Sequence, residues 1–73
     1  MLNETFTTHI TFASGDTHKE EPITRDKLRG TITRLLRGPA AAAGMIKEVK
    51  IVDTWDCIVF LARDNKVVFP SQK

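Results

Sequence analysis

The chain has 73 residues and a mass of 8.2 kDa, with 11 basic and 9 acidic side chains and a net charge of +2. This length permits one small domain. Hydrophobic residues make up 41% of the chain and charged residues 27%, a globular composition that argues against intrinsic disorder. No window approaches the roughly 18 consecutive apolar residues of a membrane-spanning helix, so we expect no membrane partner.

The start of the chain and its cysteine content indicate a compartment. Met1-Leu2-Asn3-Glu4 lacks the basic and apolar regions of a secretory signal. Cys57 is the only cysteine and cannot form an internal disulfide, which is typical of a reducing environment. We therefore expect a protein of the host-cell cytoplasm.

The first predicted strand covers residues 5–13, where apolar and polar side chains alternate with a period of two. One face of this strand is apolar apart from one threonine and consists of Phe6, Thr8, Ile10 and Phe12. The β-branched and aromatic content supports a strand with one buried face. Ser14-Gly15-Asp16 predicts a turn, and the polar residues 17–21 predict a short returning strand. Pro22 and the charges before it are typical of a sheet edge.

A single amphipathic helix is predicted at residues 25–37. Its apolar stripe has the spacing i, i+4, i+7 and i+8 and consists of Leu28, Ile32, Leu35 and Leu36. Thr24 stands at the expected N-cap position, and Gly38-Pro39 ends the helix because proline cannot continue it. Residues 39–44 are rich in alanine and could form either one further helical turn or a compact loop.

The remainder of the chain predicts an antiparallel meander. Its strands are separated by two tight turns and are placed at residues 45–52, 57–62 and 67–69. The expected fold class is therefore α+β, in the order β-β-α-β-β-β, with one amphipathic helix packed on one face of an antiparallel sheet. Residues 1–73 are expected to form a single domain whose ends, 1–4 and 71–73, are frayed.

The predicted strand at 57–62 is apolar on both faces, as in a strand buried on both sides. One helix covers only one face of a sheet, so the face expected to carry Cys57, Val59 and Leu61 needs another cover. Sheet curvature, with the amino-terminal hairpin folded over this face, is one candidate. The other is a partner or a second copy of the chain, because exposed apolar patches usually mark interfaces.

The sequence offers little for metal or covalent chemistry. His9, His18 and Cys57 are the soft ligands and lack the spacing of a zinc site, so we expect no metal and no cofactor. Catalysis by Cys57 would need a nearby base, but this residue begins an apolar strand, where cysteine usually behaves as a small hydrophobic residue. The chain has no Gly-rich phosphate loop. We therefore expect no catalytic residue and no enzyme activity.

The predicted helix carries much of the positive charge. Between Thr24 and Gly38 there are five basic residues and one acid, Asp26, a local net charge of +4. Four of the bases fall outside the apolar stripe: Lys27, Arg29, Arg34 and Arg37. These bases form either a solvated face or a docking surface for phosphates or an acidic protein. The excess of arginine over lysine favours bidentate contacts with carboxylate or phosphate.

Trp55 is the only tryptophan and lies in a predicted turn. It either folds back on the core or, if exposed, has the size and type of an interface hot spot.

The leading interpretation is a non-catalytic interaction protein that binds a larger host protein or nucleoprotein complex through the helix bases and Trp55. The alternative is a small dimeric domain that contacts a nucleic-acid backbone with the same bases. Backbone contact fits better than base reading, because no aromatic residues are interleaved with these bases for base stacking.

The segments Met45-Ile46-Lys47-Glu48-Val49-Lys50-Ile51-Val52, Cys57-Ile58-Val59-Phe60-Leu61-Ala62 and Lys66-Val67-Val68-Phe69 resemble the terminal meander of a group of small inhibitors. These are the small anti-CRISPR inhibitors of type I effector complexes, which combine a compact antiparallel sheet with one helix. The likeness is one of architecture, as in other small phage and mobile-element accessory proteins, and carries over no functional residue. It implies a non-catalytic inhibitor that acts by occupying a surface, often one built to hold nucleic acid.

Overall fold

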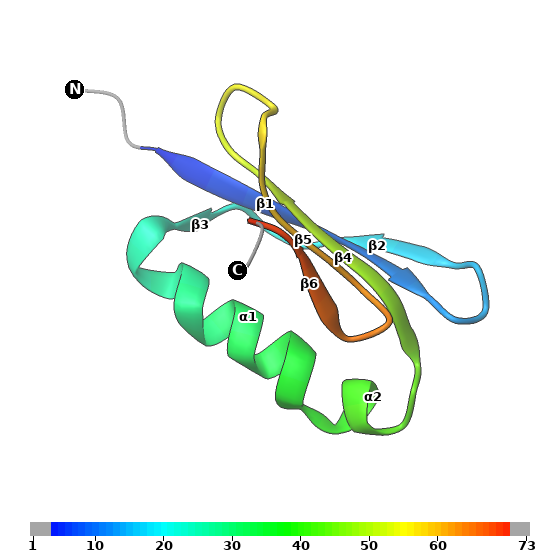
Figure 1. Cartoon of the computed structure of the whole chain (residues 1–73). Helices are drawn as coiled ribbons and strands as arrows, with labels where there is room; N and C mark the ends of the chain where they lie inside the picture. Colours follow the sequence, from blue (N-terminus) through cyan, green and yellow to red (C-terminus); the bar gives the residue numbers. More distant parts are fainter. Residues whose placement is uncertain (1–3, 71–73) are drawn as a thin grey trace.

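A computed structural model describes residues 4–70 and shows one layer of helix against one face of an antiparallel sheet (Figure 1). The strands are β1 (Thr5–Phe12), β2 (Thr17–Lys19), β3 (Ile23–Thr24), β4 (Ile46–Val52), β5 (Ile58–Arg63) and β6 (Lys66–Phe69). The helical segments are the 3-10 helix η1 (Arg25–Lys27), α1 (Leu28–Arg37) and α2 (Pro39–Ala42). The predicted α+β class is confirmed, with an amphipathic helix on one face of the sheet. The fraying expected at 1–4 and 71–73 falls, apart from Glu4, outside the described residues.

The strand order is β2–β1–β4–β5–β6. Strand β3 also pairs with β1, on the same edge as β2 but nearer the start of β1. Strands β4, β5 and β6 form the predicted meander, and every described pairing is antiparallel. The returning strand is shorter than the predicted 17–21, because β2 ends at Lys19. The backbone N–H of Glu20 still donates to the Thr8 carbonyl oxygen at 2.9 Å. Pro22 has no backbone N–H to donate, and the next residue paired with β1 is Ile23.

The core lies between α1 and the sheet. Its buried cluster consists of Phe6, Ile10, Leu35, Val49, Ile51, Phe60 and Ala62. The other members of the predicted helix stripe, Leu28, Ile32 and Leu36, are partly buried against it. Thr8 is also buried, so the predicted inward face of the first strand is confirmed. Each fully buried aliphatic or aromatic side chain stabilises the fold by about 1.5–3 kcal/mol.

The connection from α1 to β4 depends on glycine at two positions. A Cβ atom at Gly38 would lie 2.2 Å from the carbonyl oxygen of Arg34, so no larger residue fits there. Gly38 separates α1 from α2, which begins at Pro39 and forms the helical turn that was one alternative for residues 39–44. Gly44 has a φ of 71° and turns the chain into β4.

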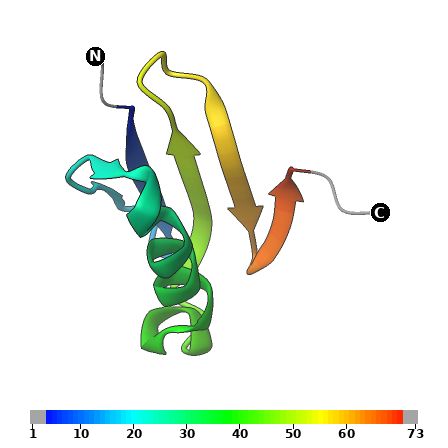
Figure 2. The same ribbon diagram turned by 90° about the vertical axis from the view of Figure 1, so that its left-hand side faces the viewer.

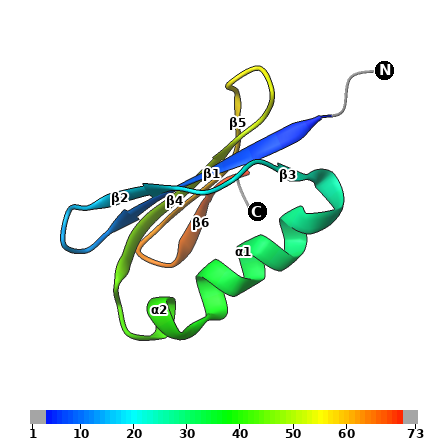
Figure 3. The same cartoon turned by 180° about the vertical axis from the view of Figure 1, so that it is seen from behind.

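The helix covers only part of its side of the sheet. In Figure 2, α1 lies beside β1 and β4, whereas β5 and β6 fan away from it. Figure 3 shows the same layering from behind, and no helix or strand among residues 4–70 packs on the opposite face. The hairpin of β1 and β2 extends the sheet edge and does not fold over that face. This candidate cover for the second face is therefore wrong.

A bulge in β5 changes which of its side chains lie on which face of the sheet. Between β4 and β5 the register shifts from Ile51↔Phe60 to Val52↔Ile58, which leaves Val59 as the extra residue. Val59 therefore lines a groove on the helix side instead of the far face. Cys57 lies outside the strand, which begins at Ile58. The prediction that Cys57, Val59 and Leu61 share one face is wrong, because a period-two pattern assumes an unbroken strand.

A second bulge lies in β6. The register shifts from Ala62↔Val67 to Leu61↔Phe69, which leaves Val68 as the extra residue. Cross-strand partners project from the same face. Leu61 and Phe69 therefore lie together on the face opposite α1, whereas Ala62 and Val67 belong to the helix side.

Candidate binding surfaces

The five bases of the predicted helix divide into paired and unpaired residues. Arg25 Nη2 donates to Glu4 Oε1 at 2.5 Å, and Arg34 Nη2 donates to Glu20 Oε1 at 2.8 Å. Within residues 4–70 the other three bases form no ion pair; they are Lys27, Arg29 and Arg37. All five are exposed. The four bases of the predicted face are therefore exposed, and one of them, Arg34, is offset within the chain, as is the neighbouring charge of Arg25 outside that face.

Arg34 lies on the flank of α1 that faces β2 and β3. It lines a shallow hollow with Thr31, Glu20 and His18. The Arg34–Glu20 contact joins residues 14 positions apart in sequence, and the Arg25–Glu4 contact joins residues 21 apart. Sequence reasoning missed both pairs because they depend on where β2 and β1 pack relative to the helix.

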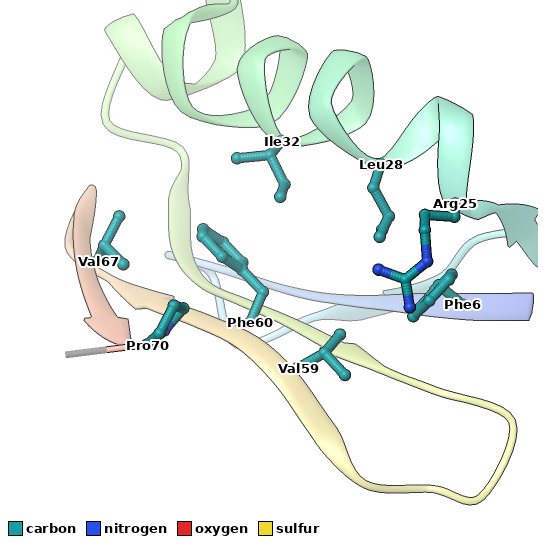
Figure 4. Close-up of a pocket in the computed structure, with 8 residues that line it drawn as sticks. All are labelled: Phe6, Arg25, Leu28, Ile32, Val59, Phe60, Val67 and Pro70. Atoms are coloured by element: carbon teal, nitrogen blue, oxygen red, sulfur yellow. The ribbon is translucent and has the colours of Figure 1, made fainter. Parts of the chain in front are cut away.

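An apolar groove of about 490 Å³ lies on the other flank of α1, above β5 and β6 (Figure 4). Leu28 and Ile32 point into it from the helix, and Phe60 and Val67 form its strand side. Arg25 is the one charged residue in the described lining, with its guanidinium carbon 5.2 Å from the ring centroid of Phe6. The groove exists because α1 covers the central strands and leaves the carboxyl-terminal strands open. It has the size and polarity to receive an apolar side chain.

Trp55 lies in the loop between β4 and β5, and 65% of its surface is exposed. The alternative in which this side chain folds back on the core is therefore wrong. The loop is fixed by Asp53, whose Oδ1 accepts hydrogen bonds from the backbone N–H groups of Trp55 and Cys57, both at 2.9 Å. The backbone N–H of Thr5 donates to Thr54 Oγ1 at 2.9 Å and ties the loop to β1. Trp55 is thus presented to solvent on an ordered turn.

The structure does not bring all the predicted partner-binding residues together. Figure 1 places the loop that carries Trp55 at the opposite end of the molecule from α2 and the last turn of α1. Arg37 is in that last turn, so Trp55 and Arg37 do not belong to one compact patch. Cys57 is exposed beside Trp55, and Leu61 is half-buried on the far face. Their roles as a dimer or partner face stay predictions.

The face of the sheet opposite α1 carries two rows of cross-strand partners. One row is Lys19, His9, Lys50, Leu61 and Phe69. The neighbouring row is Thr17, Thr11, Glu48, Arg63 and Lys66. Sequence analysis did not identify this surface, because its bases are dispersed along four strands and become neighbours only through the register.

One carboxyl group near the helix has a shifted pKa. The Thr24 hydroxyl donates a hydrogen bond to the Asp26 carboxylate, which lowers the pKa of Asp26 below its usual value. Thr24 precedes η1 as predicted, yet its side chain caps no backbone N–H. The Thr24–Asp26 contact replaces the expected N-cap bond and keeps the acid ionised at the start of the helical segment.

Comparisons with protein-family models, curated proteins and solved structures return no match. In residues 4–70 no helix is long and apolar enough to cross a membrane. No three side chains of the His, Cys, Asp and Glu types gather closely enough within the described range to hold a metal ion. The sequence predictions of no catalytic residue and no cofactor stay predictions.

Proposed function

We propose that the protein is a non-catalytic interaction protein that binds an acidic surface of a larger host protein or nucleoprotein complex in the host-cell cytoplasm. The observation that carries the proposal is that Lys27, Arg29 and Arg37 are exposed without an ionic partner in the described chain. Arg29 and Arg37 lie on α1, which is fixed against the core through Leu35, and Lys27 ends η1 directly before it. A rigid helix therefore presents these bases, and guanidinium groups favour bidentate contacts with carboxylates or phosphates.

Other predicted contact residues have secondary roles in this proposal. Arg34 contributes less than its neighbours because Glu20 already offsets its charge. Trp55 forms a separate contact, used only by a partner long enough to reach both ends of the molecule. The groove between α1 and β5 can take an apolar side chain beside the basic face.

The central experiment compares two variants that change the net charge by the same amount. Arg29→Glu/Arg37→Glu alters the outer face of α1, whereas Lys47→Glu/Lys66→Glu alters exposed bases on strands. Each protein is used to capture partners from nuclease-treated host extract, and the affinity of the main captured component is then measured. We expect a loss of about tenfold or more for the helix variant, corresponding to about 1.4 kcal/mol. Equal losses in both variants would remove α1 as the binding element.

The resemblance to anti-CRISPR inhibitors supports a more specific form of the proposal, in which a phage or mobile element encodes the protein as an inhibitor. The test adds the protein to a purified type I effector complex and measures binding of target DNA in a gel-shift assay. The inhibitor proposal expects less DNA bound with the wild-type chain than with Arg29→Glu/Arg37→Glu. Unchanged DNA binding at saturating protein would contradict it for that complex.

The alternative function is a dimeric domain whose helix bases contact a nucleic-acid backbone. The same three unpaired bases support it, and light scattering measures whether the chain dimerises. Direct binding of a DNA duplex that weakens steeply with salt, and is lost in Arg29→Glu/Arg37→Glu, would favour this alternative.

A further inference from the structure

We propose that the face of the sheet opposite α1 binds single-stranded nucleic acid. The site is separate from the helix bases, so it does not depend on the function proposed above. It consists of the row Lys19, His9, Lys50, Leu61 and Phe69, together with the neighbouring row of threonines and bases. Both rows run across five strands of the sheet, and no helix or strand of residues 4–70 packs on this face.

The charge of this face is complementary to a polyanion. Lys19 and Lys50 flank His9 in their row, and that row contains no carboxylate. The one acid of the neighbouring row, Glu48, accepts a hydrogen bond from Arg63 Nε at 2.9 Å and is thereby neutralised. With Arg63 and Glu48 offsetting each other, the two rows carry three further bases, Lys19, Lys50 and Lys66. An anionic chain that crosses the sheet meets bases on both rows.

Four further carboxylates border the face at the end of the row that carries Lys19. Asp53 and Asp56 line a shallow hollow with Thr7, His9 and Lys19, at the end of the sheet nearest the β4–β5 loop. Asp53 already accepts two backbone hydrogen bonds within that loop. Glu20 and Glu21 line a further hollow with Thr7 and Lys19, and Glu20 is paired with Arg34. The acids therefore gather around Lys19, whereas Lys50 and Lys66 share neither hollow with them.

The polar groups between the bases are hydrogen-bond donors suited to phosphate. Thr7 and Thr11 flank His9 on β1, and Thr17 faces Thr11 from β2. Threonine hydroxyls and lysine ammonium groups are common phosphate contacts in nucleic-acid complexes. This mixture of hydroxyls and ammonium groups favours a phosphate backbone over an acidic protein surface.

Phe69 explains why we infer a single strand and not a duplex. It lies in the same row as Lys50, with Leu61 between them, and 46% of its surface is exposed. An exposed ring on a sheet, next to bases that hold the backbone, is a stacking platform for an unpaired base. A duplex keeps its base faces stacked internally and cannot use Phe69 in this way.

The test measures fluorescence anisotropy of a labelled oligothymidine of about 16 nucleotides, the upper range for one small binding domain. Wild-type protein is compared with the sheet variant Lys19→Glu/Lys50→Glu. The single variant Lys50→Glu is matched with the control Lys47→Glu, an exposed base of the same strand that belongs to neither proposed surface. We expect a loss of at least about tenfold for the sheet variant and under about threefold for the control. The slope of log affinity against log salt should fall by about 1.4 when two phosphate contacts are lost.

A second pair of variants tests the stacking platform. Phe69→Leu keeps an apolar side chain and should weaken binding about fivefold or more. Val68→Ala, at the exposed residue just before it, changes no ring and should have little effect. Thermal unfolding shows whether each variant is folded, and Lys19→Gln/Lys50→Gln replaces the charge reversal if that variant is not. No binding at low salt, equal losses in Lys50→Glu and Lys47→Glu, equal binding of a duplex, or stronger binding of polyglutamate would each overturn the proposal.

Discussion

Arg34 and Glu20 form an ion pair that joins α1 to the connection between β2 and β3, with 2.8 Å between Nη2 and Oε1. Their side chains are 57% and 24% exposed, so solvent screens much of the attraction. We expect a coupling of about 0.2–1 kcal/mol in a double-mutant cycle of Arg34→Ala and Glu20→Ala, measured by urea denaturation. A coupling above about 2 kcal/mol, or one that is insensitive to salt, would contradict this assignment as a surface pair.

Two glycines of the helical region should respond oppositely to alanine. At Gly38 the added Cβ meets the Arg34 carbonyl oxygen at 2.2 Å, so Gly38→Ala must displace backbone and lower the free energy of unfolding. At Gly30, inside α1, nothing lies within 4 Å, and Gly30→Ala should raise it by about 0.5–1 kcal/mol through helix propensity. Thermal unfolding of the two variants checks both signs. Stabilisation by Gly38→Ala would mean that the α1–α2 junction differs from this structure.

Asp53 should hold the loop that presents Trp55. Its carboxylate accepts two backbone hydrogen bonds, so Asp53→Ala leaves two N–H groups without that acceptor. We expect a loss of about 1–2 kcal/mol in stability and faster amide exchange at Trp55 and Cys57. Asp64→Ala, in the β5–β6 turn, is the control and should leave exchange at Trp55 unchanged.

The pH dependence of Asp26 should depend on Thr24. The hydrogen bond from Thr24 lowers the pKa of Asp26 in the folded chain, so its stabilising contribution is present above the unfolded pKa, near 3.9, and is lost as the pH falls through the folded value. Thr24→Val should raise the pKa of Asp26 toward its ordinary value in an NMR titration of the side-chain carboxyl. Thr33→Val, on the exposed part of α1, should not change it.

Much of the fold could be predicted because its signals are local. The alternation around Phe6 and Ile10 identified β1, and the stripe that ends at Leu36 identified α1. The bulges at Val59 and Val68 could not be predicted, because they arise from the pairing of β5 with β4 and of β6 with β5. A single extra residue moves a side chain to the other face, which is why Val59 was placed wrongly.

The candidate site was less predictable than the fold. Helix periodicity placed Arg29 and Arg37 on the exposed side of α1 correctly, because that depends only on neighbours in sequence. Two of the helix bases are paired through tertiary packing, which the sequence pattern does not show. These ion pairs are Arg25–Glu4 and Arg34–Glu20. The row that joins Lys19 to Lys50 through His9 needs the register of three strands, and no local pattern encodes it.

The central pair of the sheet is formed by β1 and β4, which lie on opposite sides of the helical crossover in sequence. Neither the leading hairpin nor the trailing meander contains a complete core, since Phe6 and Ile10 must meet Val49 and Ile51 from the other half. Bringing β1 and β4 together closes the crossover into a loop, and this costs chain entropy before the main apolar contacts form. Folding should be cooperative, and a chain cut within the crossover should yield two fragments that acquire structure only when mixed.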